Sequence, residues 1–263
     1  MYNKLLALPS LENTRDLGGM KTADGKTVKA HRLIRSGELS RASDADLAVL
    51  SKVYGVGTVV DLRTPAEILQ APDKPVPGAR QVYLSLLDES FFGIARDEYS
   101  VEAWMNMFRD TDRAPEDVFE EMYLKLLFDD YAAPVFRSFF DVLLSQKEGA
   151  VLWHCSAGKD RVGVTSAVLE LCLGVDEETV LEDYLLTGVF TGDVCRALLQ
   201  TFAAFADPRQ LSAMEVLLSV KPRYLRRLID GMKNRYGGAK EFVIGRFGVT
   251  PDELQELRFL YLE

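Results

Sequence analysis

Residues 154–161, His154-Cys155-Ser156-Ala157-Gly158-Lys159-Asp160-Arg161, place an arginine six positions after a cysteine, with a glycine between them. The residues just before this motif, 149–153, form a short apolar run that is typical of a buried strand. After it, apolar side chains recur at helical spacing, at Val164, Val168, Leu171 and Cys172. The motif is therefore predicted to be a strand-to-helix turn, where backbone N–H groups at a helix N-terminus attract an anion.

A cysteine in such a turn is suited to phosphate chemistry. The helix dipole and the neighbouring Arg161, together with His154, should favour the thiolate form of Cys155 at neutral pH. A thiolate beneath an anion-binding turn can attack a phosphate ester.

Length, charge and composition narrow the class of protein. The 263 residues are 48% hydrophobic, so the chain can bury a sizeable core. The net charge of −9 disfavours nucleic acid as a partner, and an anionic substrate must be attracted by local charge. No apolar run approaches the roughly 20 residues that span a bilayer, and the N-terminus does not resemble a signal peptide. We therefore expect a cytoplasmic protein without stable membrane insertion.

The cysteines and histidines give no sign of a disulfide framework or a metal site. Three cysteines is an odd number, and their spacing does not suit zinc. We interpret Cys172 as a core residue and Cys195 as a buried or half-buried helix residue without a role. With only two histidines in the chain, we expect no metal and no cofactor.

The pattern of elements predicts an α/β fold, with a central, mostly parallel sheet flanked by helices and a mostly helical second half. We expect one domain over residues 1–263, since no stretch resembles a linker. Strands are predicted at 31–35, 56–62, 82–87 and 150–153, and helices at 43–53, 116–128, 132–146, 162–173, 176–187, 194–205, 211–220, 222–236, 241–247 and 250–262. Ligands of such sheets bind beyond the carboxyl ends of the strands, where the motif, Arg35 and residues 61–63 are predicted to lie.

With this motif, the chain resembles the bacterial tyrosine and dual-specificity protein phosphatases whose catalytic loop has the form His-Cys-x-x-Gly-Lys-Asp-Arg. That family includes secreted mycobacterial and listerial enzymes that also act on phosphoinositides. The segments 13–19 (Asn-Thr-Arg-Asp-Leu-Gly-Gly) and 33–37 (Leu-Ile-Arg-Ser-Gly) fit the same resemblance, as do the C-terminal helices. The resemblance therefore spans nearly the whole chain.

The resemblance implies a role for each residue of the loop. Cys155 would be the nucleophile that forms a phosphocysteine, and Arg161 would hold two phosphate oxygens. Backbone N–H groups of residues 156–161, which include Ser156, Ala157 and Gly158, would bind the oxygens in the transition state. His154 would orient the loop, although a plain strand-end histidine is the alternative. The substrate would be a phosphorylated protein or a phosphoinositide, and phosphate, sulfate or vanadate would bind in the loop.

The general acid is left open between three candidates. Asp160 is the candidate that the family suggests, and Asp61, at the end of another strand, is the second. An aspartate between residues 88 and 112 is the third. The alternative role of Asp61 is an ion pair with Arg63 or Arg35. Asp61 and Arg63 are therefore also expected at the substrate site.

Two interpretations are open for each of three further features. Lys159 resembles the loop lysine of phosphoinositide phosphatases, or it simply faces solvent. Arg15 contributes to the substrate site, or it pins the N-terminal segment to the sheet. Residues 187–214 correspond to a helical lid of the family, or they pack as ordinary core.

One position departs from the family pattern. Tyrosine phosphatases usually carry Ser or Thr directly after the loop arginine, where the hydroxyl assists the departing thiolate, but this chain has Val162. We expect normal formation of the phosphoenzyme and slowed breakdown, unless Thr165 or Ser156 substitutes.

The sequence thus predicts hydrolysis of phosphate monoesters, of phosphotyrosine and also of phosphoserine, phosphothreonine and phosphoinositides, through a phosphocysteine. One alternative is a phosphate-dependent binding module with low turnover, which Val162 supports. The other is a sulfurtransferase or an arsenate-type reductase, which is disfavoured because a resolving cysteine is lacking and Cys172 is predicted to be buried. The sequence leaves the choice between protein and lipid substrates, and the oligomeric state, undecided.

Overall fold

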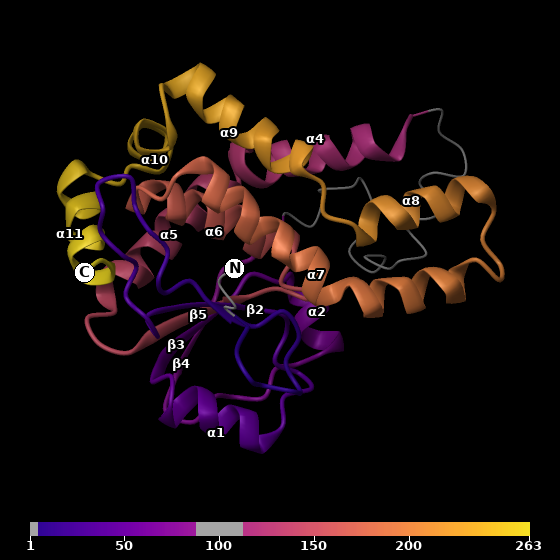
Figure 1. The fold of residues 1–263 in the computed structure, drawn as a ribbon, viewed down its shortest axis with the longest axis horizontal. Coiled ribbons are helices and arrows are strands. Elements are labelled where there is room, and N and C mark those ends of the chain that lie inside the picture. Colours follow the sequence, from indigo (N-terminus) through magenta and orange to yellow (C-terminus); the bar gives the residue numbers. More distant parts are fainter. Residues whose placement is uncertain (1–4, 88–112) are drawn as a thin grey trace.

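The fold is an α/β architecture built on a five-stranded sheet, seen in a computed structural model that describes residues 5–87 and 113–263 (Figure 1). The strands are β1 (Arg15–Asp16), β2 (Leu33–Ser36), β3 (Val56–Asp61), β4 (Arg80–Tyr83) and β5 (Ala150–His154). The helices are α1 (Asp44–Lys52), α2 (Pro65–Gln70), α4 (Pro115–Phe128), α5 (Ala132–Ser145), α6 (Asp160–Leu173), α7 (Glu177–Phe202), α8 (Pro208–Leu218), α9 (Pro222–Tyr236), α10 (Ala239–Phe247) and α11 (Pro251–Tyr261).

The order of the strands puts the motif at the middle of the sheet. The order is β1-β2-β5-β3-β4, with β2, β5, β3 and β4 parallel and the short β1 antiparallel at the edge. In the register, His154 lies between Ser36 of β2 and Asp61 of β3. The carboxyl ends of three parallel strands therefore meet where β5 enters the loop.

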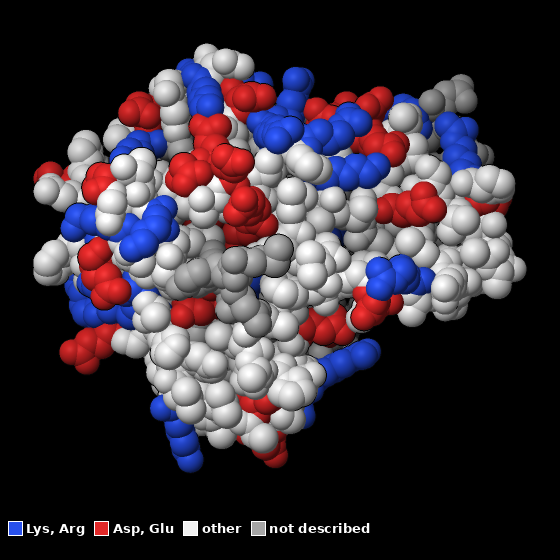
Figure 2. Space-filling model, in the orientation of Figure 1, with Lys and Arg blue, Asp and Glu red and all other residues white. Residues whose placement is uncertain are grey.

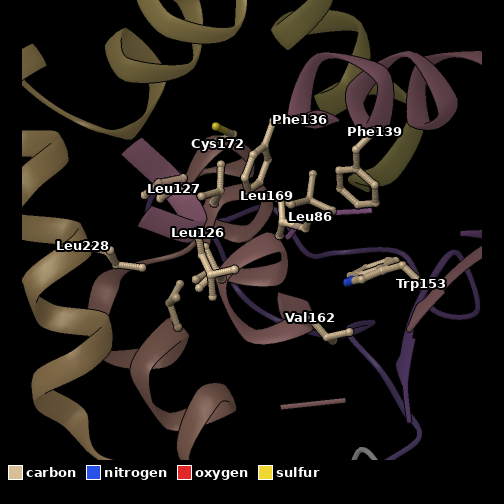
Figure 3. Close-up of a cluster of buried hydrophobic side chains, with 14 of the residues drawn as sticks. Leu86, Leu126, Leu127, Phe136, Phe139, Trp153, Val162, Leu169, Cys172 and Leu228 are labelled. Carbon is tan, nitrogen blue, oxygen red and sulfur yellow. The ribbon is translucent and has the colours of Figure 1, made fainter. Parts of the chain in front are cut away.

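The sheet is covered on both faces, because successive side chains of a strand point to opposite sides. On β5, Val151 and Trp153 belong to the larger apolar cluster, whereas Leu152 belongs to a smaller one. Helices α4 to α11 all contribute to the larger cluster, part of which is drawn in Figure 3, and α1 covers the other face. Helices α7 and α8 extend away from the sheet at one side of the molecule (Figure 1).

Helix ends follow local sequence signals. Ser43 caps α1 by accepting a hydrogen bond from the backbone of Asp46, and α6 ends at Gly174, which has the left-handed conformation. The predicted strands and most predicted helices are present within a few residues of their expected bounds. Cys172 is buried in the core as expected, and burial raises the pKa of its thiol to about 12.

Two predictions about elements were wrong. The strand β1 was not expected, because two residues carry no periodicity. Residues 176–187 and 194–205 were expected to form two helices, but α7 is continuous through Gly188. A Cβ at Gly188 would lie 2.9 Å from the Val220 side chain, so the glycine permits close packing instead of ending the helix.

Within the described residues, no helix is both long and apolar enough to cross a membrane. Acidic and basic side chains are interspersed over the face shown in Figure 2.

Candidate active site

The loop that holds the motif lies between the end of β5 and the start of α6. Its cysteine, Cys155, follows β5 directly and is only 2% exposed. Gly158 has φ +64°, and a Cβ there would lie 2.6 Å from the carbonyl oxygen of Ser36. A side chain at this position is excluded both by conformation and by space, so the glycine lets the loop pack against the end of β2.

Three successive carbonyl groups of the loop are bound from outside. Ser156 O accepts from the Glu38 backbone at 3.0 Å, and Ala157 O accepts from Asn13 Nδ2 at 3.2 Å. Gly158 O accepts from Asn13 Nδ2 at 2.9 Å and from Arg35 Nη2 at 3.0 Å. In a trans peptide the N–H points opposite to the preceding C=O, and the described chain has no cis peptide bond.

It follows that three N–H groups, those of residues 157–159, point away from these outer partners. Successive N–H groups that point to one side can bind an anion, and these three lie directly before or at the N-terminus of α6. Binding of phosphate oxygens by the loop backbone stays a prediction.

Arg161, in the first turn of α6, is held by a carboxylate from another helix. Its Nη1 donates to Glu67 Oε2 at 2.5 Å and its Nη2 to Glu67 Oε1 at 2.7 Å. Ser156 Oγ also donates to Glu67 Oε1, at 2.6 Å. Burial alone would raise the pKa of Glu67, but the charge and hydrogen bonds of Arg161, with those of Ser156 and Thr64, hold it well below its usual range. Burial would lower the pKa of Arg161, but the charge and hydrogen bonds of Glu67 raise it. Both groups therefore stay ionised.

Asp160 lies at the start of α6 with its side chain partly exposed, at 23%. Its Oδ1 accepts a hydrogen bond from the Tyr123 hydroxyl at 2.6 Å, and the Tyr123 and Tyr184 hydroxyls are 2.7 Å apart. Burial raises the pKa of both tyrosines well above the usual value, so both stay neutral donors. This position is compatible with the predicted acid role, which stays a prediction.

Lys159 takes neither of the two expected positions. Its side chain is only 7% exposed, and its Nζ donates to the carbonyl oxygens of Leu217 at 2.6 Å and Ser219 at 3.1 Å, at the end of α8. It also lies 3.0 Å from Asp160 Oδ1 and over the ring of Phe119. The ammonium thus compensates the unpaired carbonyls and negative dipole end of α8, and is not directed to solvent.

Asp61 and Arg63 were expected at the substrate site, and the structure corrects this. Both are buried, and Arg63 Nη2 pairs with Asp61 Oδ2 at 2.8 Å and with Asp73 Oδ2 at 3.0 Å. A fully buried carboxylate engaged in this way does not reach a leaving group, so Asp61 does not fit the acid role. The third candidate, an aspartate between 88 and 112, lies outside the described residues.

His154 lies beneath the loop and is also buried. Its Nε2 is 2.9 Å from Asp73 Oδ2, and its Nδ1 is 3.9 Å from Asp61 Oδ1. Asp61, Asp73 and His154 are close enough to suggest a metal site. However, the Arg63 guanidinium already supplies the cation that the two carboxylates require. This cluster supports the loop from below, and the His154 side chain is fully buried within it.

Arg15 stabilises the scaffold through a buried ion pair. It was expected at the substrate site, and the structure corrects this. It is fully buried, and its Nε donates to Asp183 Oδ1 at 3.2 Å, while Arg35 Nη1 donates to Asp183 Oδ2 at 2.7 Å. Burial lowers the pKa of Arg15 to about 10, with the charge of Arg35 adding to the effect. Through Arg35, this buried cluster reaches the carbonyl of Gly158.

Sequence reasoning missed several residues of the site. Glu67, Asp73, Asp183 and Tyr123 were not singled out, and each contacts the loop or one of its supports. Only Glu67 had a local signal, since Thr64-x-x-Glu67 is a capping box with proline at the first helical position. Even so, that signal predicts a helix start and not a partner for Arg161.

The segment 187–214 combines both expected readings. Ala213 and Met214 are buried in the core, whereas Val189 and Phe205 are exposed at 71% and 66%. Its identity as a lid stays a prediction.

The fold and loop together define an α/β protein with a turn that places a cysteine at the end of β5 and an arginine at the start of α6. The sequence matches the family model described as the tyrosine phosphatase family over residues 6–263. The chain therefore belongs to the tyrosine phosphatase family.

Individual relatives agree with this assignment. A tyrosine-protein phosphatase of Nostoc commune is 30% identical over 234 residues, 88% of this chain and 74% of that protein. The triple specificity protein phosphatase PtpB of Mycobacterium tuberculosis is 29% identical over 190 residues, 68% of this chain and 67% of that protein. A Cupriavidus necator protein assigned as a tyrosine-protein phosphatase is 27% identical over 258 residues, 98% of this chain and 88% of that protein.

Proposed function

We propose that this protein hydrolyses phosphate monoesters, phosphotyrosine first among them, through a phosphocysteine formed on Cys155. The observation that carries the proposal is the arrangement of the loop. Its carbonyls at Ser156, Ala157 and Gly158 are bound from outside, which supports convergence of the following N–H groups between Cys155 and Arg161. Membership of the tyrosine phosphatase family supports this activity.

The chemistry divides into two steps. In the first, the Cys155 thiolate attacks phosphorus, the bond from phosphorus to the ester oxygen breaks, and Asp160 gives its proton to the departing oxygen. In the second, water attacks phosphorus and gives a proton to Asp160, while the sulfur–phosphorus bond breaks and the thiolate returns. The inward N–H groups and Arg161 stabilise the phosphoryl oxygens in both transition states.

The substrate range is proposed to extend beyond phosphotyrosine, to phosphoserine, phosphothreonine and phosphoinositides. One relative, PtpB, carries the description triple specificity. The position of Lys159 bears on the lipids, because its ammonium is committed to the end of α8. A substrate with a second phosphate would have to draw Lys159 away from α8, so we place polyphosphorylated lipids behind phosphotyrosine in the expected order of preference.

A binding module with low turnover is the second candidate, and Val162 is the observation that favours it. Valine offers no hydroxyl to the departing thiolate, and its side chain is fully buried. The two candidates differ in turnover and not in binding.

Cys155→Ser provides the test. The proposal expects hydrolysis of para-nitrophenyl phosphate by the wild type, equal with and without a chelator, and loss of hydrolysis in the variant. Binding of a phosphotyrosine peptide, measured by calorimetry, should persist in the variant. Binding without measurable hydrolysis by the wild type would favour the binding module, and activity near the wild-type level in Cys155→Ser would rule out the cysteine mechanism. A panel of phosphotyrosine and phosphoserine peptides and inositol lipids would then rank the substrates.

A further inference from the structure

Glu67 lies on α2, outside the catalytic loop, yet its carboxylate connects two residues of that loop. Oε2 accepts from Arg161 Nη1, and Oε1 accepts from both Arg161 Nη2 and Ser156 Oγ. We propose that Glu67 is a positioning residue, which holds the Arg161 guanidinium in the orientation that receives the phosphoryl group. This inference rests on the proposed function, because it assumes that the phosphoryl group binds at Arg161.

The geometry of the pair leaves part of Arg161 available. Glu67 binds the end of the guanidinium, where Nη1 and Nη2 each donate one hydrogen. A guanidinium has five N–H groups in a fixed plane, so the edge formed by Nε and the second hydrogen of Nη2 is not used by Glu67. On this edge Nη2 makes only a long contact with Ser156 Oγ, at 3.3 Å. Two donors on one edge match two oxygens of a phosphoryl group. Glu67 can therefore stay paired while the phosphoryl group binds.

Glu67 itself is fixed by the start of its own helix. Its Oε2 accepts from the Thr64 backbone N–H at 2.9 Å and from the Thr64 hydroxyl at 3.1 Å, while Thr64 Oγ1 accepts from the Glu67 backbone at 3.3 Å. This reciprocal capping box ties the carboxylate to the backbone of α2. The orientation of Arg161 is thus set before any ligand arrives, which is the condition for efficient stabilisation of a transition state.

The segment that carries Glu67 supports the loop at both of its ends. Asp73, six residues further on, lies 2.9 Å from His154 Nε2, at the start of the motif 154–161, whereas Glu67 binds Arg161 at its end. Arg63 ties Asp73 to Asp61 and thereby to the end of β3. The residues 61–73 therefore form a continuous support beneath the loop.

The rival reading is that Glu67 competes with phosphate for Arg161. Its negative charge would then repel the substrate, and its removal would strengthen anion binding. Against this, the charge of Glu67 is already balanced by Arg161 at 2.5 and 2.7 Å. Burial would raise the pKa of Glu67, but Arg161 holds it far below its usual range. This low pKa reflects the same pairing. The two readings predict opposite changes in anion affinity, which makes them separable.

The experiment compares four variants with the wild-type chain. Glu67→Ala removes the carboxylate, and Glu67→Gln keeps a residue that the capping box accepts but loses the charge. Thr64→Ala weakens the box and leaves Glu67 present, so it measures the part that is only helix capping. Leu69→Ala, on the same helix and 84% exposed, is the neutral control. For each variant, kcat and KM on para-nitrophenyl phosphate, the inhibition constant of orthovanadate and the Tm are measured.

Positioning predicts a loss in kcat/KM of about 10- to 100-fold for Glu67→Ala, as expected for misplacement of a catalytic group, and a smaller loss for Glu67→Gln. Vanadate, which adopts the geometry of the transition state, should bind more weakly by a similar factor. Thr64→Ala loses the hydroxyl but keeps the backbone N–H that donates to Glu67 Oε2, so it should lower Tm and weaken vanadate binding less than Glu67→Ala does. Tighter vanadate binding and higher kcat/KM in Glu67→Gln would establish competition and overturn the proposal. A change in Tm alone, with unchanged kinetics, would overturn it equally.

The failure of this inference can be told apart from failure of the proposed function. If the wild type did not hydrolyse the aryl phosphate, binding of vanadate and of inorganic phosphate, measured by calorimetry on the same variants, would still report on Glu67. Weaker binding of both anions in Glu67→Ala would then support the positioning of Arg161, and unchanged or tighter binding would refute it.

Discussion

The Tyr123 hydroxyl, on α4, donates a hydrogen bond of 2.6 Å to Oδ1 of Asp160, which lies 37 residues further along the chain. Tyr123 is buried, and its own hydroxyl is 2.7 Å from that of Tyr184. A buried, neutral phenol is a fixed donor, so it limits the directions in which the Asp160 carboxyl group can point.

Replacing Tyr123 by Phe should therefore reduce turnover through Asp160. We expect kcat to fall about tenfold on phenyl phosphate and less on para-nitrophenyl phosphate, because a poor leaving group depends more on the acid. Loss of one buried hydrogen bond should also cost about 1 kcal/mol of stability. Steady-state kinetics on the two esters checks this, with Tyr83→Phe, whose residue is 63% exposed, as the control. An equal loss on both esters would show that Tyr123 does not act through the acid.

The sequence predicted those parts of the site that are encoded locally. A short apolar run predicted the strand before Cys155, and helical spacing predicted the helix that follows the motif. The glycine between Cys155 and Arg161 indicated a turn, and in the structure a side chain would not fit there. For the same reason the burial of Cys172 could be predicted from its place on an apolar helix face.

The partners of the loop could not be predicted, since each pairing joins positions far apart in the chain. Glu67 and Arg161 are separated by 94 residues, and Arg15 and Asp183 by 168. Nothing in the spacing of a glutamate or an aspartate indicates which arginine it will meet. An arginine or aspartate at a strand end is equally compatible with binding a substrate and with a buried ion pair. In the structure, Asp61 and Arg63 form the ion pair.

Lys159→Met tests the link between the loop and α8. The ammonium contacts two terminal carbonyls of α8, and its loss should cost about 2 kcal/mol from the charged hydrogen bonds and the helix dipole. Hydrogen exchange across residues 208–218 should then become faster, and turnover of phosphotyrosine and of polyphosphorylated lipids should fall together. Lys52→Met, an exposed lysine in the last turn of α1, is the matched control. Unchanged exchange combined with a loss restricted to the lipids would instead assign Lys159 to a second phosphate.

Acid should weaken the fold partly through Glu67. Because Arg161 and the hydrogen bonds of Ser156 and Thr64 overcome burial and hold the pKa of Glu67 far below its usual value, the folded state favours the carboxylate. This contribution is complete above the ordinary glutamate pKa of about 4.3 and is lost as the pH falls below it. Urea unfolding between pH 6 and pH 2.5 should therefore show a steeper loss of stability in the wild type than in Glu67→Gln. Parallel curves would contradict the assignment, because the other carboxylates are common to both proteins.

Val162→Thr tests the one departure from the family pattern. Val162 follows Arg161, is fully buried and lies in the apolar cluster of Figure 3. The two hydroxyls that could replace the missing one have other acceptors, since Thr165 Oγ1 donates to the Arg161 carbonyl at 2.8 Å and Ser156 Oγ donates to Glu67 at 2.6 Å. The wild type should therefore release a burst of about one equivalent of nitrophenol before a slower steady state.

In Val162→Thr the burst should shrink and the steady-state rate should rise several-fold, because a hydroxyl next to Arg161 can stabilise the thiolate as the phosphocysteine is hydrolysed. The added hydroxyl should cost about 1–2 kcal/mol of stability, since it enters an apolar cluster. Val164→Thr places the same hydroxyl at another fully buried position of α6, two residues further on, and should destabilise the protein without changing the burst. Rapid-quench or stopped-flow measurement of nitrophenol release separates the cases. A linear time course in the wild type, with Val162→Thr no faster, would mean that breakdown of the phosphocysteine does not depend on a hydroxyl at this position.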